Sequence, residues 1–503
     1  MTLENRQIVL IMTDTQRHDM LGCYRQTGLQ TPFLDKLAAG GRRFDKAYTT
    51  QPVCQAARTA LFTGQYPHEV NGWTNSSGLA DNVHTIGERL QRHGIHTAYI
   101  GKWHLDGGDY FGLGRCPKGW DPDYWFDMRC YLDRMSPEDR LLSRQAEAMK
   151  TRDFPVSFTY AHQCSDKAVR FLEANGQDDF FLVVSYDEPH GPSLSPPPFS
   201  RMYDDYVFPR SPNLDDPLDN KPEHQRVWAG DRLNQDTSAL EVRAPAFFGC
   251  HSFVDQEIGR VAAAVRQHAP DALIVYTSDH GDFLHSHRLS GKGPAAYEEI
   301  THIPLIMNGP GVEPGSIDRS PVSHIDLPPT LFAIMGLPVP RIFSGRNLLS
   351  RLTGQAGQAG PADDPVFIEF GRYEVDHDGF GGFQPLRAAF DGRYKLVVNL
   401  LTSDELYDLD LDPHELDNRI EDAQLALVRD RLHDAILAFM NRTRDPFRGY
   451  YWEIRPWRKD AVKPTWTYTH MTRQREDEDF EPRQLDYDTG LPMVEATRSK
   501  ALY

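Results

Sequence analysis

The sequence has no apolar run that approaches the roughly 18 residues needed to cross a bilayer. Residues 1–7 are largely polar, and the apolar run that follows them covers only residues 8–12. A secretory leader needs an apolar segment of about seven residues or more. We therefore expect no membrane partner and a cytoplasmic location, or a periplasmic one if a signal peptide has been removed.

Paired cysteines and an excess of basic residues are also missing. The six cysteines are spread from Cys23 to Cys250 without a Cys-x-x-Cys pair, which predicts free thiols rather than a disulfide framework or a zinc site. With 54 basic against 72 acidic residues the net charge is −18, which argues against nucleic acid or an anionic membrane as the main partner. A small anionic substrate stays open, because the local charge of a pocket decides its binding.

Short apolar runs that end abruptly in polar residues recur through the first 350 residues. Four of them occupy residues 8–12, 96–100, 180–184 and 272–276. Continuous runs of this length are typical of parallel strands buried on both faces. Helical patterns lie between them, and one apolar stripe consists of Val254, Ile258, Val261 and Val265. Strands alternating with helices predict an α/β fold with a doubly wound, mostly parallel central sheet and helices on both faces.

The character of the chain changes after about residue 361. Two short strands joined at Asp391-Gly392, a hairpin signal, precede a helical stripe formed by Leu425, Val428, Leu432, Ala435 and Phe439. These elements predict a smaller C-terminal α+β domain with a short antiparallel sheet. We expect three regions: a catalytic domain over residues 1–360, the smaller domain over 361–445, and an extended tail over 446–503. The tail would pack on the body or between the subunits of a homo-oligomer.

The most informative local segment is Cys54-Gln55-Ala56-Ala57-Arg58. Residues 56–62 favour a helix and Thr63-Gly64 would end it. Cys54 then falls at the N-terminus of this helix, where backbone N–H groups favour an anion, and Arg58 lies one turn further on the same face. A nucleophile beside a fixed cation suits the transfer of an anionic group. From spacing alone, a small buried cysteine and a surface arginine would explain the pair as well.

Several segments resemble, in order, the signature elements of the sulfatase family. The segment from Cys54 to Arg58, with Thr63-Gly64 downstream, is similar to the family's Cys-x-Pro/Ala-x-Arg element. Gly101-Lys102-Trp103-His104-Leu105 is similar to its Gly-Lys-Trp-His-Leu element. The other similar segments are residues 187–192, 277–281 with Lys292, 297–299, 303–305, 324–336 and 405–418. The resemblance covers roughly residues 7–440.

The resemblance implies a sulfuric ester hydrolase of the alkaline phosphatase superfamily. Its Cys54 would be converted to formylglycine by a formylglycine-generating maturation enzyme, and the hydrated aldehyde would attack sulfur. One divalent metal ion, Ca²⁺ with Mg²⁺ or Mn²⁺ as alternatives, would be held by Asp14, Cys54, Asp279 and His280. Asp14 and Asp279-His280 end two different apolar runs, so they can meet at one edge of the sheet, and carboxylates suit a hard divalent cation.

By the same resemblance, four residues complete the catalytic set with Cys54 and Arg58. Lys102 and Lys292 would bind the sulfate oxygens and stabilise the charge that grows in the transition state. His190 would protonate the leaving alcohol, and His104 would take a proton while the aldehyde is regenerated.

Two positions depart from the family pattern. Thr15 stands where the family usually has a second acid, which predicts a metal site with one carboxylate fewer. Ala56 stands where the commonest signature has Pro, which bears on the choice of maturation enzyme. Beyond the motifs, residues that could line the substrate pocket, or simply pack on the surface, are Trp73, Asn75, Asp106, Tyr110 and residues 193–199.

Three functions follow from these observations. The first, which we adopt, is hydrolysis of a sulfated carbohydrate or an aryl sulfate. The second is a phosphonate monoester hydrolase or phosphodiesterase on the same scaffold. Thr15 and the long tail suit it. Lys102 and His104 argue against it, because the corresponding motif of that relative has Tyr and Thr at these two places. The third is an anion- or glycan-binding protein in which Cys54 stays unmodified.

Overall fold

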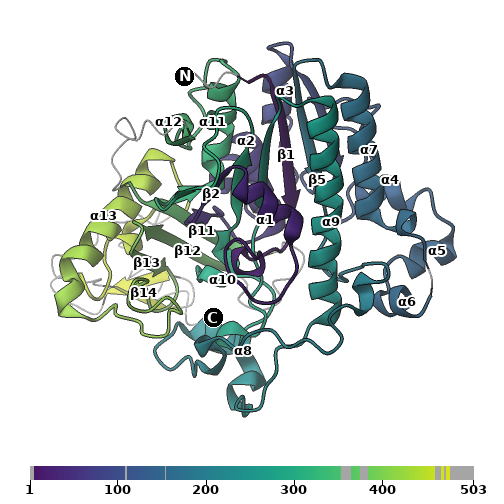
Figure 1. Cartoon of the computed structure of the whole chain (residues 1–503). Helices are drawn as coiled ribbons and strands as arrows, with labels where there is room; N and C mark the ends of the chain where they lie inside the picture. Colours follow the sequence, from purple (N-terminus) through teal and green to yellow (C-terminus); the bar gives the residue numbers. More distant parts are fainter. Residues whose placement is uncertain are drawn as a thin grey trace, which may run out of the picture. The chain divides into compact units, whose positions relative to one another are not determined.

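The four apolar runs form neighbouring strands of a seven-stranded sheet in a computed structural model of the chain (Figure 1). The strand order is β4-β5-β1-β6-β8-β2-β9. The bounds are β1 Gln7–Thr13, β2 Arg42–Phe44, β4 His96–Gly101, β5 Phe180–Ser185, β6 Leu273–Ser278, β8 Leu305–Asn308 and β9 Ser316–Asp318. Strands β4, β5, β1 and β6 run parallel, and β8 is antiparallel to both β6 and β2. The predicted mostly parallel sheet is confirmed.

The structure describes most of the chain, namely residues 5–107, 110–152, 154–352, 364–373, 383–458, 466–469 and 472–475. The chain divides into two compact units, Met1–Phe447 and Arg448–Tyr503. The domain boundary predicted at residue 360 falls outside the described ranges and remains a prediction. Across those ranges, no helix has the length and the apolarity to cross a membrane.

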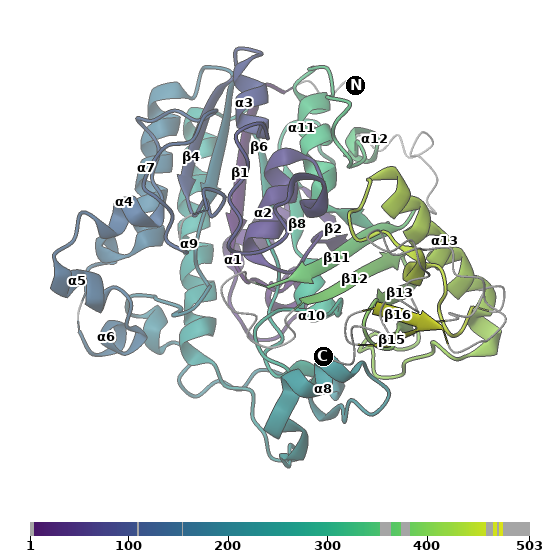
Figure 2. The ribbon, with the colours of Figure 1, turned by 180° about the vertical axis from the view of Figure 1, so that it is seen from behind.

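Helices cover both faces of the large sheet (Figures 1 and 2). Alternate side chains of a strand point to opposite faces. Val9 and Ile11 of β1 therefore join one apolar core, whereas Ile8, Leu10 and Met12 join the other. The helices of the first core include α1 (Pro32–Ala39), α7 (Tyr160–Asn175) and α9 (Pro245–His268), and those of the second include α2 (Cys54–Thr63), α3 (Ile86–Gln91) and α11 (Leu327–Ile334). The apolar stripe predicted for α9 is buried along its whole length.

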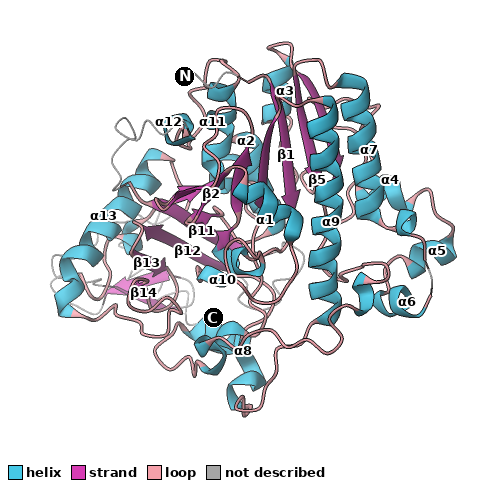
Figure 3. Ribbon diagram, in the orientation of Figure 1, coloured by secondary structure: helices cyan, strands magenta, loops and turns pink. Residues whose placement is uncertain are grey.

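Shorter elements fill the connections between these layers (Figure 3). The further helices are α4 (Met128–Leu132), α5 (Pro137–Leu142), α6 (Ala146–Thr151), α8 (Glu223–Ala229), α10 (Glu298–Thr301) and α12 (Leu349–Leu352). A small sheet consists of β10 (Val322–Ser323), β3 (Ala47–Tyr48) and β7 (His302–Ile303).

A four-stranded antiparallel sheet is formed by the part of the chain that follows the large sheet. Its strands, in order, are β11 (Val366–Arg372), β12 (Phe383–Phe390), β13 (Tyr394–Asn399) and β14 (Glu405–Asp408). The predicted hairpin is confirmed: β12 pairs with β13 across a turn in which Gly392 has φ 106°. Helix α13 (Ala426–Arg442) buries Leu432, Ile436 and Phe439. Of the predicted stripe, Leu432 and Phe439 are confirmed, whereas Val428 and Ala435 are only partly buried and Leu425 precedes the helix.

The unit Arg448–Tyr503 contains a hairpin of β15 (Trp466–Thr469) and β16 (Thr472–Arg475). A short 3-10 turn, Tyr450–Trp452, precedes it. The expected packing of the tail on the body or between subunits stays a prediction.

Candidate active site

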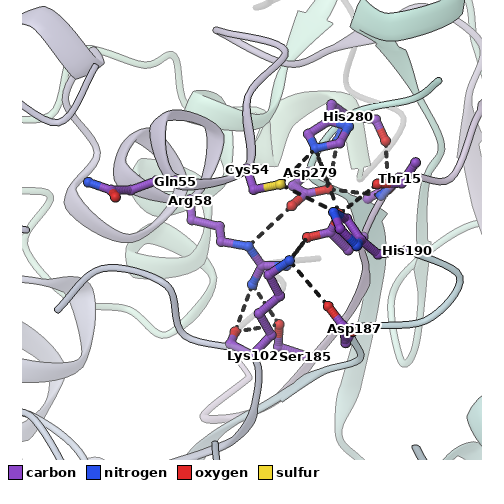
Figure 4. A network of polar contacts seen from close by, with 12 residues as sticks. Thr15, Cys54, Gln55, Arg58, Lys102, Ser185, Asp187, His190, Asp279 and His280 are labelled. Atoms are coloured by element: carbon purple, nitrogen blue, oxygen red, sulfur yellow. Dashed lines mark hydrogen bonds and ion pairs between the residues drawn. The ribbon is translucent and has the colours of Figure 1, made fainter. Parts of the chain in front are cut away.

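Polar residues gather where the parallel strands of the large sheet end. Asp14 follows β1, Lys102 follows β4, and Asp279 with His280 follows β6. His190 lies in the loop after β5. Because parallel neighbours end at the same edge of a sheet, these side chains form one cluster (Figure 4). The structure thus brings together residues that the sequence assigned to a single site.

Cys54 is the first residue of α2, and its side chain enters this cluster. The helix ends at Thr63, where Gly64 follows with φ 71°, as the sequence predicted. Cys54 Sγ lies 2.8 Å from Lys292 Nζ, 3.2 Å from His280 Nε2 and 3.7 Å from Asp14 Oδ1. The sulfur is therefore surrounded by one cation and two groups that can bind a metal ion.

Arg58 lies one turn further along α2 and is fully buried. Its Nη2 donates to Asp14 Oδ2 at 3.1 Å, and its Nε donates to Asp279 Oδ2 at 3.1 Å. Its Nη1 donates to the backbone oxygen of Lys102 and to Ser185 Oγ, as Figure 4 shows. The guanidinium therefore pairs with two carboxylates and fixes their relative position. The alternative interpretation from spacing, in which Arg58 is a surface residue, is wrong.

Four side chains could hold one metal ion: Asp14, Cys54, Asp279 and His280. Arg58 binds Oδ2 of each carboxylate, and His280 Nε2 lies 3.7 Å from Oδ1 of each. One donor atom from each of the four residues lies within 4.8 Å of all the others. A cation with ligands at about 2.3–2.6 Å spaces them up to roughly 5 Å apart. The donor set therefore fits a single divalent cation.

Thr15, which replaces the family's usual second acid, supports the two carboxylates instead. Its hydroxyl donates to Asp14 Oδ1 at 2.7 Å, and its backbone N–H donates to Asp279 Oδ1 at 3.2 Å. These bonds require a left-handed backbone, with φ 66° at Thr15, which is uncommon for a β-branched residue. The expected loss of one carboxylate is thus accompanied by two hydrogen bonds to the carboxylates that remain.

The charges around the cluster shift its titrating groups in opposite directions. Burial opposes ionisation of Asp14, but Lys102 and other cations hold its pKa well below its usual range. Burial raises the pKa of Asp279 to about 6, and the charge of Asp14 adds to the rise. Burial and Asp14 also oppose ionisation of the Cys54 thiol, yet Lys292 and Lys102 hold its pKa well below the usual value. A cation among these donors would favour the ionised form of all three groups.

Two buried lysines flank residue 54. Lys102 Nζ lies 2.7 Å from Asp14 Oδ2 and 3.2 Å from Asp187 Oδ1. Burial opposes the charge of Lys292, but the Cys54 sulfur and other groups, Asp14 among them, raise its pKa above the usual value. Both ammonium groups therefore stay charged and can bind an anion that reaches residue 54.

The two histidines expected to move protons differ in exposure. His104 is buried, and its Nδ1 has no partner among the described residues. Burial lowers the pKa of His104, which favours the neutral ring. His190 is half-buried, and its Nδ1 lies 2.8 Å from the backbone oxygen of Gly191 and 3.0 Å from Tyr110 Oη. The His104 ring is therefore suited to accept a proton, and the His190 ring can offer its second nitrogen, Nε2, to a substrate.

Some residues of the cluster were given no role by the sequence. Ser185 and Asp187 bind Arg58 and Lys102, and their position at the end of β5 is a signal that could have found them. Gln55 points away from the cluster in Figure 4. Its backbone N–H donates to Asn75 Oδ1 at 3.1 Å, which places this candidate pocket residue beside the start of α2.

The other candidate pocket residues lie at varying distances from the chemistry. Asp106 braces its own loop by accepting from the Leu113 N–H at 2.8 Å. The Trp73 ring packs edge-on against Phe447, with centroids 5.5 Å apart. Tyr110 contacts the His190 ring directly, and the Ser193 N–H donates to the His190 carbonyl at 2.9 Å.

Comparison with known proteins identifies the family. The sequence profile described as Sulfatase matches residues 6–337, and that of N-sulphoglucosamine sulphohydrolase, C-terminal, matches residues 288–442. The chain belongs to the sulfatase family. The uncharacterized sulfatase YidJ of Escherichia coli (strain K12) is 43% identical over 497 residues, which cover 97% of each chain. This sulfatase is therefore an enzyme that hydrolyses sulfate esters, and its family depends on a metal ion.

Solved structures share the fold at lower identity. BT4656 in complex with its substrate D-glucosamine-2-N,6-O-disulfate has a TM-score of 0.70 at 21% identity, over 88% of this chain and 98% of that chain. The phosphonate monoester hydrolase of Agrobacterium radiobacter has a TM-score of 0.71 at 23% identity, over 87% and 96%. At these identities the likeness establishes the fold, whereas the activity rests on the family.

Proposed function

We propose that this sulfatase cleaves sulfate monoesters of a carbohydrate with a nucleophile formed from Cys54. The position of Cys54 Sγ carries the proposal, because it lies 2.8 Å from the Lys292 ammonium and 3.2 Å from His280 Nε2. A nucleophile, an anion-binding cation and metal-binding donors thus meet at one point. Similarity in fold to a protein solved with a sulfated glucosamine supports a sugar as the leaving alcohol. Aryl sulfates are the second substrate class.

Conversion of Cys54 to formylglycine would place a hydrated aldehyde where the sulfur now lies. The sulfur position therefore marks the place of the oxygen nucleophile that a sulfate ester requires. A formylglycine-generating maturation enzyme would act before the first turnover. If Cys54 stayed a thiol, the same cations would make an anion- or glycan-binding site without turnover.

Asp14, Asp279, His280 and residue 54 would hold one divalent ion, for which we propose Ca²⁺ ahead of Mg²⁺ and Mn²⁺. When bound, the ion supplies a Lewis acid that favours an ionised nucleophile and draws charge from the sulfate group. The protein's own part is to fix the ligands. Arg58 holds the Oδ2 atoms of both carboxylates, and their Oδ1 atoms, which accept hydrogen bonds from Thr15, would face the ion.

The remaining side chains would bind the sulfate group and move protons. Lys292 and Lys102 would bind sulfate oxygens and stabilise the negative charge that grows in the transition state. His190 would donate a proton to the leaving alcohol, because it is half-buried and its Nε2 has no partner in the described part of the chain. His104, whose buried ring favours the neutral form, would accept a proton from residue 54.

The second candidate is a phosphonate monoester hydrolase or phosphodiesterase. The similarity in fold to such an enzyme and the Thr15 replacement favour it. Lys102 and His104 oppose it, because their arrangement around residue 54 follows the sulfatase pattern. Comparing kcat/KM for 4-nitrophenyl sulfate and sulfated monosaccharides with that for phosphonate monoesters and phosphate diesters decides between them. Turnover of the phosphorus esters without turnover of any sulfate ester would overturn sulfate esters as the substrates of this enzyme.

Mass spectrometry of the peptide that contains Cys54 tests the nucleophile directly. Conversion makes this peptide roughly 18 Da lighter, since oxygen replaces sulfur and two hydrogens are lost. We expect activity to rise in proportion to the converted fraction. Full activity in a preparation whose Cys54 is entirely a thiol would overturn the proposed nucleophile.

Assembly and location complete the proposal. We propose self-association through the tail, residues 446–503, and a cytoplasmic location, or a periplasmic one after removal of a signal peptide. Light scattering of the full chain and of a chain that ends at Phe447 tests the first point. The tail is a convenient unit to remove, because Arg448–Tyr503 is compact by itself.

A further inference from the structure

Tyr110 touches four of the side chains that surround residue 54. Its hydroxyl donates to Asp187 Oδ1, and its oxygen lies 3.0 Å from His190 Nδ1. Its ring centroid lies 3.9 Å from Lys102 Nζ, a distance typical of a cation–π contact. The ring also lies 4.8 Å from the His190 ring and 6.0 Å from the His104 ring. Nothing in the sulfatase motifs assigns a role to this tyrosine.

The hydrogen atoms around Tyr110 can be assigned from the network of acceptors. The Gly191 carbonyl, 2.8 Å from His190 Nδ1, can only accept, so Nδ1 carries a hydrogen. The one hydroxyl hydrogen of Tyr110 goes to Asp187, whose carboxylate also faces the Lys102 ammonium. The Tyr110 oxygen therefore shares the single His190 Nδ1 hydrogen with the Gly191 carbonyl, as the second acceptor of a bifurcated hydrogen bond. The hydrogen bonds from His190 to Tyr110 and from Tyr110 to Asp187 therefore run in one direction, toward the Asp187 carboxylate.

The backbone around Tyr110 is held in place. The Arg129 N–H donates to the Phe111 carbonyl at 3.0 Å, and the Gly114 N–H donates to Asp127 Oδ2 at 2.9 Å. Burial and the neighbouring Asp187 raise the pKa of Tyr110 well above its usual value, so the hydroxyl keeps its hydrogen. A fixed, protonated phenol is what a constant hydrogen bond to a histidine requires.

We infer that Tyr110 is a positioning residue for the proton donor, which holds the His190 ring with a hydrogen on Nδ1 and leaves Nε2 to the leaving group. The inference rests on the proposed role of His190 as the acid. As the oxygen nucleophile of residue 54 bonds to sulfur, the S–O ester bond breaks and its electron pair passes to the leaving oxygen, which takes the proton from His190 Nε2. The ring keeps its Nδ1 hydrogen throughout, so no change of tautomer is needed. The Tyr110–Asp187 pair stabilises the cationic ring before the transfer.

Tyr110→Phe removes the hydroxyl and keeps the ring over Lys102. With matured enzyme, we expect kcat/KM for a sulfated monosaccharide to fall by about 10–100-fold, as for other partners that orient a reactive ring. We expect at most about a threefold fall for 4-nitrophenyl sulfate, because 4-nitrophenolate leaves without needing a proton. KM should stay the same for both esters.

Tyr131→Phe is the matched control. Tyr131 lines the same hollow as His190, but its hydroxyl donates to the Phe158 carbonyl at 2.6 Å. Tyr131→Phe should leave the ratio of kcat/KM for the sulfated monosaccharide to that for 4-nitrophenyl sulfate unchanged. If Tyr110→Phe does not fold, Asp187→Asn removes the charge at the other end of the chain. Because Asp187 also faces Lys102, this variant should lower both activities, and that on the sugar sulfate more.

The double variant with His190→Ala separates this inference from the proposed function. Tyr110→Phe should add nothing to the loss that His190→Ala causes on the sugar sulfate. An additional loss, or equal losses on both esters from Tyr110→Phe while His190→Ala remains selective, would overturn the role of Tyr110 alone. If His190→Ala is itself unselective, the acid role of His190 and this inference fall together.

Discussion

The Arg58 guanidinium and the Asp279 carboxylate meet 3.1 Å apart at the edge of the sheet, with both side chains out of contact with solvent. The same guanidinium binds Asp14 at 3.1 Å. Methionine at position 58 would leave the buried Asp279 carboxylate without its arginine partner and Asp14 paired with Lys102. We expect Arg58→Met to lower the free energy of unfolding by about 3–5 kcal/mol. A divalent ion should restore part of the loss, because it supplies positive charge to the same carboxylates.

Urea unfolding with and without a chelator measures both effects. Arg243→Met is the matched control, because Arg243 pairs with Glu241 at the surface, where an ion pair contributes little to stability. Equal losses in the two variants would show that Arg58 does not hold the buried carboxylates. If no metal ion reduces the stability loss of Arg58→Met, the carboxylates that Arg58 holds are not the ones that bind the ion.

Thr15→Asp should change the metal preference of the site. The replacement adds a third carboxylate beside Asp14 and Asp279, and Ca²⁺ binds more tightly as carboxylate ligands are added. The backbone at position 15 has φ 66°, which Asp adopts more readily than Thr. We expect a larger rise in melting temperature on adding Ca²⁺ than the unchanged protein shows. The larger rise is expected because a ligand that binds only the folded state stabilises it by RT ln(1 + L/Kd), where L is the free ligand concentration, and this quantity grows as Kd falls.

Thr15→Asn separates charge from backbone conformation. Asparagine tolerates the left-handed region as well as aspartate does, but it brings no negative charge. It should therefore leave the Ca²⁺-dependent shift close to that of the unchanged protein. Equal shifts in Thr15→Asn and Thr15→Asp would show that the added charge does not reach the ion.

The sequence was sufficient for the residues that end strands or begin helices. Asp14, Asp279 and His280 follow buried apolar runs, and the edge of a parallel sheet brings such residues together whatever the details of the loops. Cys54 was placed correctly because the helical segment that follows it, which ends at Gly64, starts at this residue. The predicted sheets were confirmed for the same reason, since their hydrophobic periods are local.

Contacts made by loops could not be predicted in this way. Tyr110 reaches Asp187 and His190 across a large separation in sequence, from a loop without hydrophobic period. Spacing placed Arg58 beside Cys54 but left a surface position open, because its burial depends on two carboxylates that follow different strands. Thr15 was recognised as a missing acid, but its two hydrogen bonds follow from a backbone angle that no residue pattern indicates.

Asp255 should make stability fall as pH rises through the weakly acidic range. It lies on α9 and accepts from the Phe33 and Leu34 N–H groups at the start of α1, at 3.0 Å and 2.8 Å. Burial raises its pKa to about 7 in spite of these bonds. The folded state then keeps a proton that the unfolded chain has lost above about pH 4. The stability that Asp255 contributes is fully present below that pH. It declines toward pH 7, by at most roughly 1.4 kcal/mol per pH unit.

The difference between the unchanged protein and Asp255→Asn isolates this slope. Asparagine does not titrate, so its unfolding free energy should vary less between pH 4 and pH 7. Its amide nitrogen would face one of the two N–H donors, which should lower stability by about 1–3 kcal/mol at every pH. Asp236→Asn, at an exposed turn where Asp236 accepts from the Ser238 N–H, should keep the slope of the unchanged protein. The same slope in Asp255→Asn would show that Asp255 is ionised throughout this range.

Ala56→Pro should raise the fraction of Cys54 that becomes formylglycine without unfolding the helix. Ala56 is the third residue of α2, ahead of the first bond of the helix, in which the Ala57 N–H donates to the Val53 carbonyl at 2.9 Å. The N–H groups of a first turn have no partner within the helix, so proline at position 56 removes no helical bond. It also restores the residue that the commonest sulfatase signature has there. Mass spectrometry of the Cys54 peptide, after co-expression with a maturation enzyme that accepts the Pro signature, measures the converted fraction.

Ala57→Pro is the control one residue further along the helix. It removes the bond to the Val53 carbonyl and should cost about 3 kcal/mol of stability, whereas the extra ring atoms at the buried position 56 should cost about 1–3 kcal/mol at most. A maturation enzyme that needs the Pro signature should convert Ala56→Pro more completely than either Ala57→Pro or the unchanged protein. Equal conversion of all three would show that recognition depends on Cys54 and Arg58 and not on the residue between them.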